Sequence, residues 1–284
     1  MEELDDPEVL ARTDRLQLQV RAAHFSHARQ GMADAEKFLH ATPRLHHGCA
    51  GVITPPDTAP LVQAAAHLVD LDWASNPDDR DGPLANLHGE VHFDKHPAYS
   101  LAYLCTLAAH SISVTPVTPT LDAAWLGSLL PTTAYAQNPA KQLAVRFLTR
   151  VPLLWGAEAW LAAIAQDWRL RILRYAESAA LVAGQDDMLY GWSLARFPGF
   201  WPNTVCIARL GDSGTPVDMR TTTLQSILRK RRFTTIEIAA PGAKHIDQAL
   251  HLLHLGEWVA LYLAALHGID PADRTPLEIL GLAA

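Results

Sequence analysis

Apolar and polar positions in the second half of the chain follow two periods, one typical of strands and one typical of helices. Short apolar or β-branched runs predict strands over residues 151–155, 204–209 and 233–238. Longer stretches with helical spacing predict helices over about 138–149, 156–180, 187–195, 217–231 and 243–267. Because strands and helices alternate, the pattern predicts an α/β fold with a parallel sheet and crossover helices.

The first half repeats this order less clearly, after a helical entry segment. Its composition predicts helices over about 6–40, 59–69 and 98–110, and strands over 49–54, 89–93 and 112–117. Pro131, Thr132, Thr133 and Asn138-Pro139 indicate a linker between the two halves. We therefore expect an entry segment over 1–45, an N-terminal subdomain over 46–132 and a C-terminal subdomain over 133–284.

Composition and charge exclude several classes of protein. Hydrophobic residues make up 49% of the 284, which is ample for a core and excludes intrinsic disorder. The 23 Lys and Arg against 30 Asp and Glu give a net charge of −7, which argues against a nucleic-acid partner. The first residues are acidic, unlike a signal peptide, and no run of ~18 uncharged apolar residues occurs. We expect a cytoplasmic protein with no membrane partner.

No pattern in the sequence indicates a metal or an organic cofactor. The three cysteines are far apart and form no Cys-x-x-Cys pair. His251 and His254 lie one turn apart on a predicted helix, but no third ligand can be identified beside them. Walker-type and dinucleotide-binding glycine loops do not occur. We expect neither a metal site nor a cofactor.

Four segments of the second half are specific enough to indicate a family. They are Asn138-Pro139-Ala140-Lys141, Arg150–Gly156, Asp187–Trp192 and Leu255–Pro271. Their order and spacing resemble the C-terminal half of the bifunctional phosphoglucose/phosphomannose isomerases, and within that group the TobH-type actinobacterial proteins. The resemblance covers about residues 138–284. It implies two doubly wound sugar isomerase (SIS) subdomains, each a parallel sheet flanked by helices.

The resemblance implies isomerisation of a hexose 6-phosphate through an enediol, which needs a base that moves a proton between adjacent carbons. In the family this base is a glutamate in an Asn-Glu-Asn-Ala-Lys-like segment. An ungapped match places Arg174 at that position, with Ala176 agreeing. Glu177 lies three residues later, nearly one helical turn on, and is the candidate for an offset base. The base is therefore either displaced or lost.

The resemblance also implies a histidine that opens the sugar ring, in a His-Asn-Glu-x-x-Gly-Trp-like segment. In this chain Asp186 occupies the histidine position, ahead of Gly191-Trp192. A carboxylate can carry protons, but it is a poor acid at neutral pH. A family lysine near the C-terminus has no counterpart in the final Leu-Gly-Leu-Ala-Ala. These departures argue against catalysis.

SIS domains hold phosphate with hydroxyls and backbone amides at helix N-termini, after glycine-rich turns. The corresponding first turn here contains two prolines, which remove amide donors, and Asp57, which repels a phosphate. Its hydroxyl candidates are Thr54 and Thr58, whose alternative roles are strand-end and helix-capping residues. The second loop offers Lys95, His96 and Ser100 in place of a Ser-Gly-Asn-Thr-like pattern.

Three functional hypotheses follow. The first is an aldose–ketose isomerase of hexose 6-phosphates that uses Glu177 and Asp186. The second is a catalytically inactive SIS-fold protein that binds a sugar phosphate or a nucleotide sugar and regulates or partners an isomerase or mutase. The third is a structural dimer that has lost the ligand. In each case we expect a homodimer, with the apolar helix 243–267 as a source of interface area.

Overall fold

The computed structural model describes residues 29–30, 32–35, 37, 65, 105, 119–120, 122–211 and 219–271. The elements that it defines after residue 121 are α5 (Ala123–Ser128), η4 (Tyr135–Gln137), α6 (Pro139–Leu148), β1 (Val151–Gly156), α7 (Ala159–Ala176), β2 (Leu181–Ala183), η5 (Asp187–Trp192), α8 (Trp201–Thr204), β3 (Val205–Gly211), α9 (Met219–Lys230), β4 (Thr234–Ala239) and α10 (His245–His267). Strands and helices alternate, as the sequence predicts.

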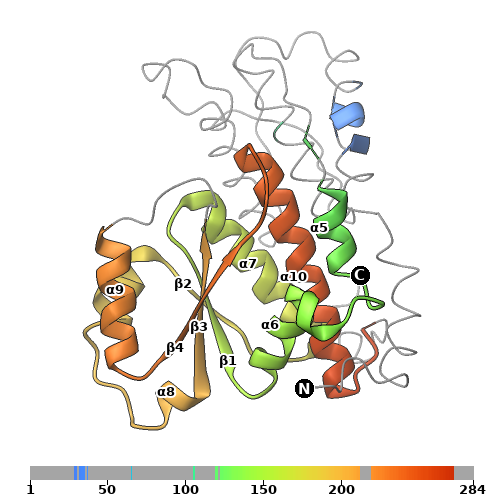
Figure 1. Ribbon diagram of the computed structural model, residues 1–284. Helices are drawn as coiled ribbons and strands as arrows, with labels where there is room; N and C mark the ends of the chain where they lie inside the picture. Colours follow the sequence, from blue (N-terminus) through green and yellow to red (C-terminus); the bar gives the residue numbers. More distant parts are fainter. Residues whose placement is uncertain are drawn as a thin grey trace, which may run out of the picture.

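The four strands form one parallel sheet in the order β2-β1-β3-β4. The central strands, β1 and β3, are buried on both faces, which is why their sequences read as continuous apolar runs. Helices α6, α7 and α10 cover one face, and α9 lies on the other (Figure 1). The parallel sheet with helices on both sides is confirmed.

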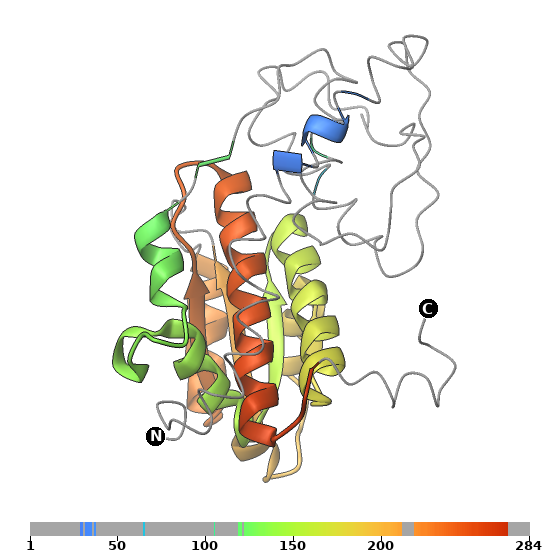
Figure 2. The ribbon, with the colours of Figure 1, turned by 90° about the vertical axis from the view of Figure 1, so that its right-hand side faces the viewer.

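Helix α10 is the centre of the described core. Every residue from Ile246 to Ala265 is buried, and the helix lies between α5 and α7 (Figure 2). Its length and apolarity would allow it to cross a membrane, but 94% of its most apolar window is buried inside the protein, as in a core helix. The expectation that this helix supplies a dimer interface is therefore wrong, because its apolar surface is already covered within one chain.

The predicted helix over 156–180 is too long. Helix α7 ends at Ala176, and Glu177 adopts a left-handed conformation with φ of 46° while its backbone N–H donates to Ile172 O. This helix cap turns the chain into β2, a strand that the sequence analysis missed. Because β2 has three residues and its first, Leu181, is exposed, it carries neither an alternating nor a continuous apolar pattern.

The residues predicted as a linker are held in place by three side chains. The Tyr262 hydroxyl donates to Leu129 O at 2.6 Å. Asn138 Nδ2 donates to Leu130 O at 3.1 Å, and Lys141 Nζ donates to Pro131 O at 3.0 Å. All three side chains are fully buried. Three consecutive carbonyl groups are thus tied to α6 and α10, and the division into domains stays a prediction.

Little of the first half is described. The described residues within the predicted helices 6–40, 59–69 and 98–110 are helical, and Ala35, Ala65 and Cys105 belong to the same buried cluster as α10. The strands and the two phosphate-binding loops predicted before residue 118 lie outside the described residues. Part of the first half therefore packs against the core of the second.

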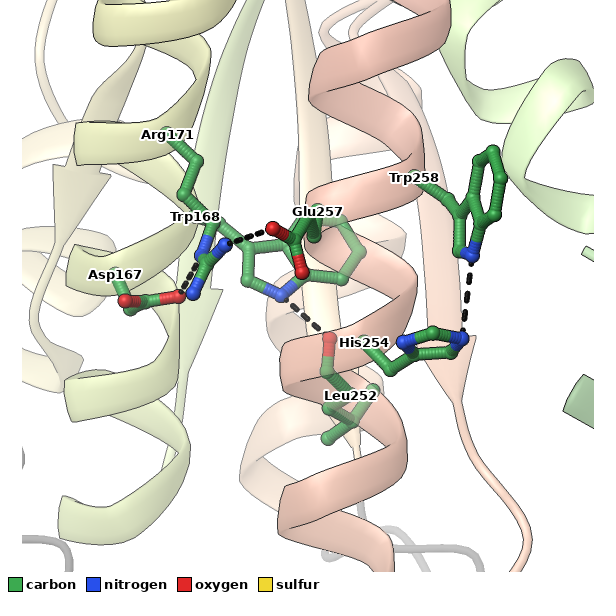
Figure 3. Close-up of polar contacts among 7 residues, drawn as sticks. All are labelled: Asp167, Trp168, Arg171, Leu252, His254, Glu257 and Trp258. Atoms are coloured by element: carbon green, nitrogen blue, oxygen red, sulfur yellow. Dashed lines mark hydrogen bonds and ion pairs between the residues drawn. The ribbon is translucent and has the colours of Figure 1, made fainter. Parts of the chain in front are cut away.

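Helices α7 and α10 are in close contact at Gly256. A Cβ atom on this glycine would lie 2.3 Å from Nε1 of Trp168, so only glycine fits there. The indole N–H of Trp168 donates to Leu252 O at 2.8 Å, one turn earlier on α10 (Figure 3). The tryptophan thus fills the groove between the helices and satisfies its own donor.

A buried ion network lies beside this contact. Arg171 on α7 pairs with Asp167 at 2.6 Å and with Glu257 on α10 at 3.1 Å (Figure 3). Burial alone would lower the pKa of Arg171, but the two carboxylates raise it above its ordinary value. The guanidinium stays charged and joins two acidic side chains that would otherwise be buried without a counter-ion.

Replacing Gly256 by alanine should destabilise the fold, because the added methyl group overlaps the Trp168 ring. Overpacking of this kind costs about 1–3 kcal/mol in the free energy of unfolding, measured by urea titration. Gly127→Ala in α5 is the matched control, since nothing lies within 4 Å of its Cβ position. The control should be neutral or stabilising, and equal unfolding midpoints for Gly256→Ala and the wild type would contradict the contact.

Arg171→Met should destabilise the protein by about 3–5 kcal/mol, because it leaves Asp167 and Glu257 buried without their counter-ion. The same substitution at Arg174, one turn later and exposed, should change the unfolding free energy by less than about 0.5 kcal/mol. Chemical denaturation of the two variants in parallel measures the difference. Similar losses in both would mean that the buried network does not stabilise the helix pair.

Candidate functional site

The topology of the sheet defines one position where a ligand is expected. Strand β1 continues through α7 to β2 on one side, and β3 continues through α9 to β4 on the other. Helices α7 and α9 lie on opposite faces of the sheet (Figure 1). The connections that leave the neighbouring strands β1 and β3 therefore run to opposite sides of the sheet. Open α/β sheets bind ligands outside the carboxyl ends of the strands at such a point. The candidate site is therefore the carboxyl end of β1 and β3.

Three side chains form a row across the sheet at this end. In the strand register Trp155 on β1 pairs with Arg209 on β3, and Arg209 pairs with Glu237 on β4. Register partners in a parallel sheet point to the same face. The Arg209 guanidinium carbon lies 5.9 Å from the centre of the Trp155 ring, and Nη1 forms an ion pair with Glu237. The row brings a cation, an indole and a carboxylate together.

Arg209 is buried in this row. The residue is 9% exposed, and its Nε atom has no hydrogen-bond partner among the residues that the structure describes. The Glu237 side chain is 44% exposed, so the pair has one buried and one solvated member. A buried guanidinium with an unused donor is costly unless something else binds it.

Gly211, the last residue of β3, lies directly against the ion pair. A Cβ atom at this position would be 3.1 Å from Arg209 Nη1 and 3.1 Å from Glu237 Oε1. The Arg209–Glu237 ion pair therefore lies at the end of β3. It reaches the carboxyl edge of the sheet, where the topology predicts a ligand.

Two hydrogen bonds hold the segment after β2 next to the row of Trp155, Arg209 and Glu237. The indole N–H of Trp155 donates to Gln185 Oε1 at 3.1 Å, and the Gly184 N–H donates to Asp187 Oδ2 at 3.1 Å. Asp186 lies between these two anchored residues and is exposed. The structure thus places Asp186 at the carboxyl edge of β2, next to the candidate site.

The start of α7 is poorly suited to an anion. A Cβ atom on Gly156 would lie 2.3 Å from the Leu161 carbonyl carbon, so the helix begins very close to the end of β1. The carboxylate of Glu158, which precedes the first turn, accepts from Trp160 Nε1 at 2.9 Å. A negative charge at that end would repel a phosphate. Arg209 is the better candidate for anion binding.

The proposed catalytic residues are not brought together. Arg174 and Glu177 lie at the C-terminal end of α7, which leads to the start of β2, whereas Asp186 follows the end of β2. Both Glu177 and Asp186 are exposed, at opposite ends of a strand that rises ~10 Å over its length. The substrate-binding candidates Thr54, Thr58, Lys95, His96 and Ser100 lie outside the described residues.

Two other reactive groups in the described part are packing residues. Burial raises the pKa of the Cys206 thiol in β3, and burial lowers the pKa of His251 in α10. The His251 Nε2 atom accepts from the Asp122 N–H at 3.3 Å, so Nδ1 carries the proton and donates to Asp247 O at 2.7 Å. Both side chains are thus neutral at neutral pH and lie in the core.

Sequence reasoning did not single out Arg209 or Glu237. Two signals were available in the sequence. Arg209 is a charged residue at the end of the otherwise apolar predicted strand Thr204–Arg209, and Glu237 is a charged residue within the predicted strand Phe233–Ile238. That both lie on one face, in adjacent strands, depends on the strand register. The register cannot be read from a single sequence.

Comparisons with known proteins agree with this architecture. Residues 136–280 match the family model described as the bacterial phospho-glucose isomerase C-terminal SIS domain. A bifunctional phosphoglucose/phosphomannose isomerase of Aquifex aeolicus is 25% identical over 147 residues, covering 50% of this chain and 45% of the relative. A glucose-6-phosphate isomerase-like protein of Thermus thermophilus is 27% identical with a TM-score of 0.51, over 66% of this chain and 65% of that one.

A second protein of Thermus thermophilus, described as hypothetical, matches 97% of this chain and 95% of its own length with a TM-score of 0.60. Its 11% identity shows a shared fold and no more. The matches to the two isomerase-like relatives span less than two thirds of their lengths. Because the family match extends over about half of the chain, this protein belongs to the family of bacterial phospho-glucose isomerase C-terminal SIS domains.

Proposed function

We propose that this protein binds a sugar phosphate at the carboxyl end of β1 and β3 and does not isomerise it. The observation that carries the proposal is Arg209, a buried cation at the point where the connections of the sheet diverge. Membership of the isomerase family supports a phosphorylated sugar as the ligand class. In this proposal the chain regulates or partners an enzyme that acts on the same ligand.

The positions of the candidate catalytic groups support binding without turnover. An enediol mechanism needs a base at the reacting carbons and an acid at the ring oxygen of the same sugar. Within the described residues, Glu177 lies at the opposite end of β2 from Asp186, and Arg174 stands where the family glutamate is expected. Isomerisation by Glu177 and Asp186 is the second candidate function, and family membership favours it.

We also propose a soluble, cytoplasmic homodimer that requires no cofactor and binds neither nucleic acid nor membranes. The net charge of −7 and the burial of α10 support this part of the proposal. Since α10 is covered within the chain, the interface has to come from other surfaces. Light scattering should give twice the chain mass of 31.1 kDa, and a monomeric mass would refute the dimer.

Glucose 6-phosphate, mannose 6-phosphate or fructose 6-phosphate at millimolar concentration should raise the melting temperature. A ligand at 100 times its Kd adds ~2.7 kcal/mol to the free energy of unfolding, whereas unphosphorylated glucose should add nothing. A coupled isomerase assay on the same samples should detect no conversion.

No shift with any of the three sugar phosphates would contradict the binding function. Turnover that Glu177→Gln abolishes would instead establish the isomerase. Turnover that survives this substitution would exclude Glu177 as the base.

A further inference from the structure

We propose that Arg209 binds the anionic group of the ligand and that Glu237 is an internal competitor that occupies Arg209 when no ligand is bound. This inference rests on the proposed function and names the residues that control it. It applies to any ligand that presents a phosphate or a similar anion at the carboxyl end of β3.

Arg209 has the properties of an anion-binding residue. Its side chain is 10% exposed, and its guanidinium lies beside the Trp155 ring and close to Gly211 at the end of β3. A guanidinium carries five N–H donors in a planar fork, which suits the oxygen atoms of a phosphate. One of these donors pairs with Glu237, and Nε has no partner among the described residues. Donors therefore remain for a second anion.

Glu237 is poorly placed to be a purely structural partner. It lies on β4, an edge strand of the described sheet, and its side chain is 44% exposed, so the pair gains little from burial of the carboxylate. The carboxylate is, however, the anion that contacts the Arg209 fork. A phosphate that approaches the same fork is repelled by it and has to share or replace it.

Gly211 places no side chain against the ion pair. A methyl group there would lie 3.1 Å from both charged partners and would cover the pair from the strand end. With glycine, no side chain from this position covers the pair, and Glu237, whose side chain is 44% exposed, can turn toward solvent from β4.

Competition predicts effects of opposite sign for the two members of the pair. Removing the charge of Glu237 should strengthen anion binding, because it removes the competitor and its repulsion. Removing the charge of Arg209 should weaken binding. A pair that only stabilises the sheet would show a loss of stability in both variants and no gain in affinity in either.

The test is isothermal titration of the full chain with glucose 6-phosphate and, separately, with inorganic phosphate. Glu237→Gln keeps the shape of the side chain and should tighten binding by about 10-fold, the scale of one charge-assisted hydrogen bond. Arg209→Met should weaken binding by at least about 10-fold, and Arg209→Lys, which keeps the charge without the fork, should lie between Arg209→Met and the wild type.

Matched controls carry the same changes of charge at the other end of the sheet. Asp270→Asn after the end of α10 and Arg229→Met in the last turn of α9 alter exposed residues, so both should bind as the wild type does. Circular dichroism and urea unfolding establish that each variant is folded. If Arg209→Met does not fold, Glu237→Gln and Arg209→Lys still decide the question.

Equal affinities for the wild type and Arg209→Lys, or weaker binding by Glu237→Gln, would overturn the inference and leave sugar-phosphate binding intact. Binding by Glu237→Gln alone would support competition at Arg209 and would contradict sugar-phosphate binding by the wild type. Failure of the wild type and every variant to bind either anion would overturn both the inference and the proposed function.

Discussion

The burial of α10 is the constraint on which the rest of the described structure depends. A helix that is covered on all sides needs a partner for every polar group that it carries, and α10 carries Asp247, His251, His254 and Glu257 among its buried residues. Each is met by a specific neighbour: Thr120 donates to Asp247, Asp122 donates to His251, Trp258 donates to His254 and Arg171 pairs with Glu257. The Trp258 contact lies within α10, whereas the other three fix the positions of α5 and α7 against it. Helix α7 in turn begins against the end of β1 at Gly156.

The segments that resemble the isomerase family are mainly packing segments. Asn138 and Lys141 hold the carbonyl groups before α6, and Gly256 admits the ring of Trp168. By contrast, Arg174 and Asp186, which the resemblance predicts at the catalytic positions of the family, are exposed. Substitutions at exposed positions disturb the core little. The fold and its sequence signature can therefore persist while the chemistry at those positions changes.

The sequence predicted the elements whose pattern is set by burial. Strands β1, β3 and β4 and helices α6, α9 and α10 lie within a few residues of their expected ranges, because their apolar residues face a core. The end of α7 was missed because a left-handed glutamate, rather than glycine or proline, stops it. The site was missed for a different reason: Trp155, Arg209 and Glu237 are 28 or more residues apart and meet only through the register of three strands. Residue identity alone carries no information on that register.

The place of α10 in the chain has a consequence for synthesis. The sheet face that it helps to cover is complete in sequence at Ala239, yet the covering helix ends at His267. A ribosome that makes the protein therefore releases the whole sheet, with α6 and α7, before it releases the last helix that covers this face. During that interval part of the apolar face of the sheet lacks its cover, and transiently exposed apolar surface of this kind favours association between chains.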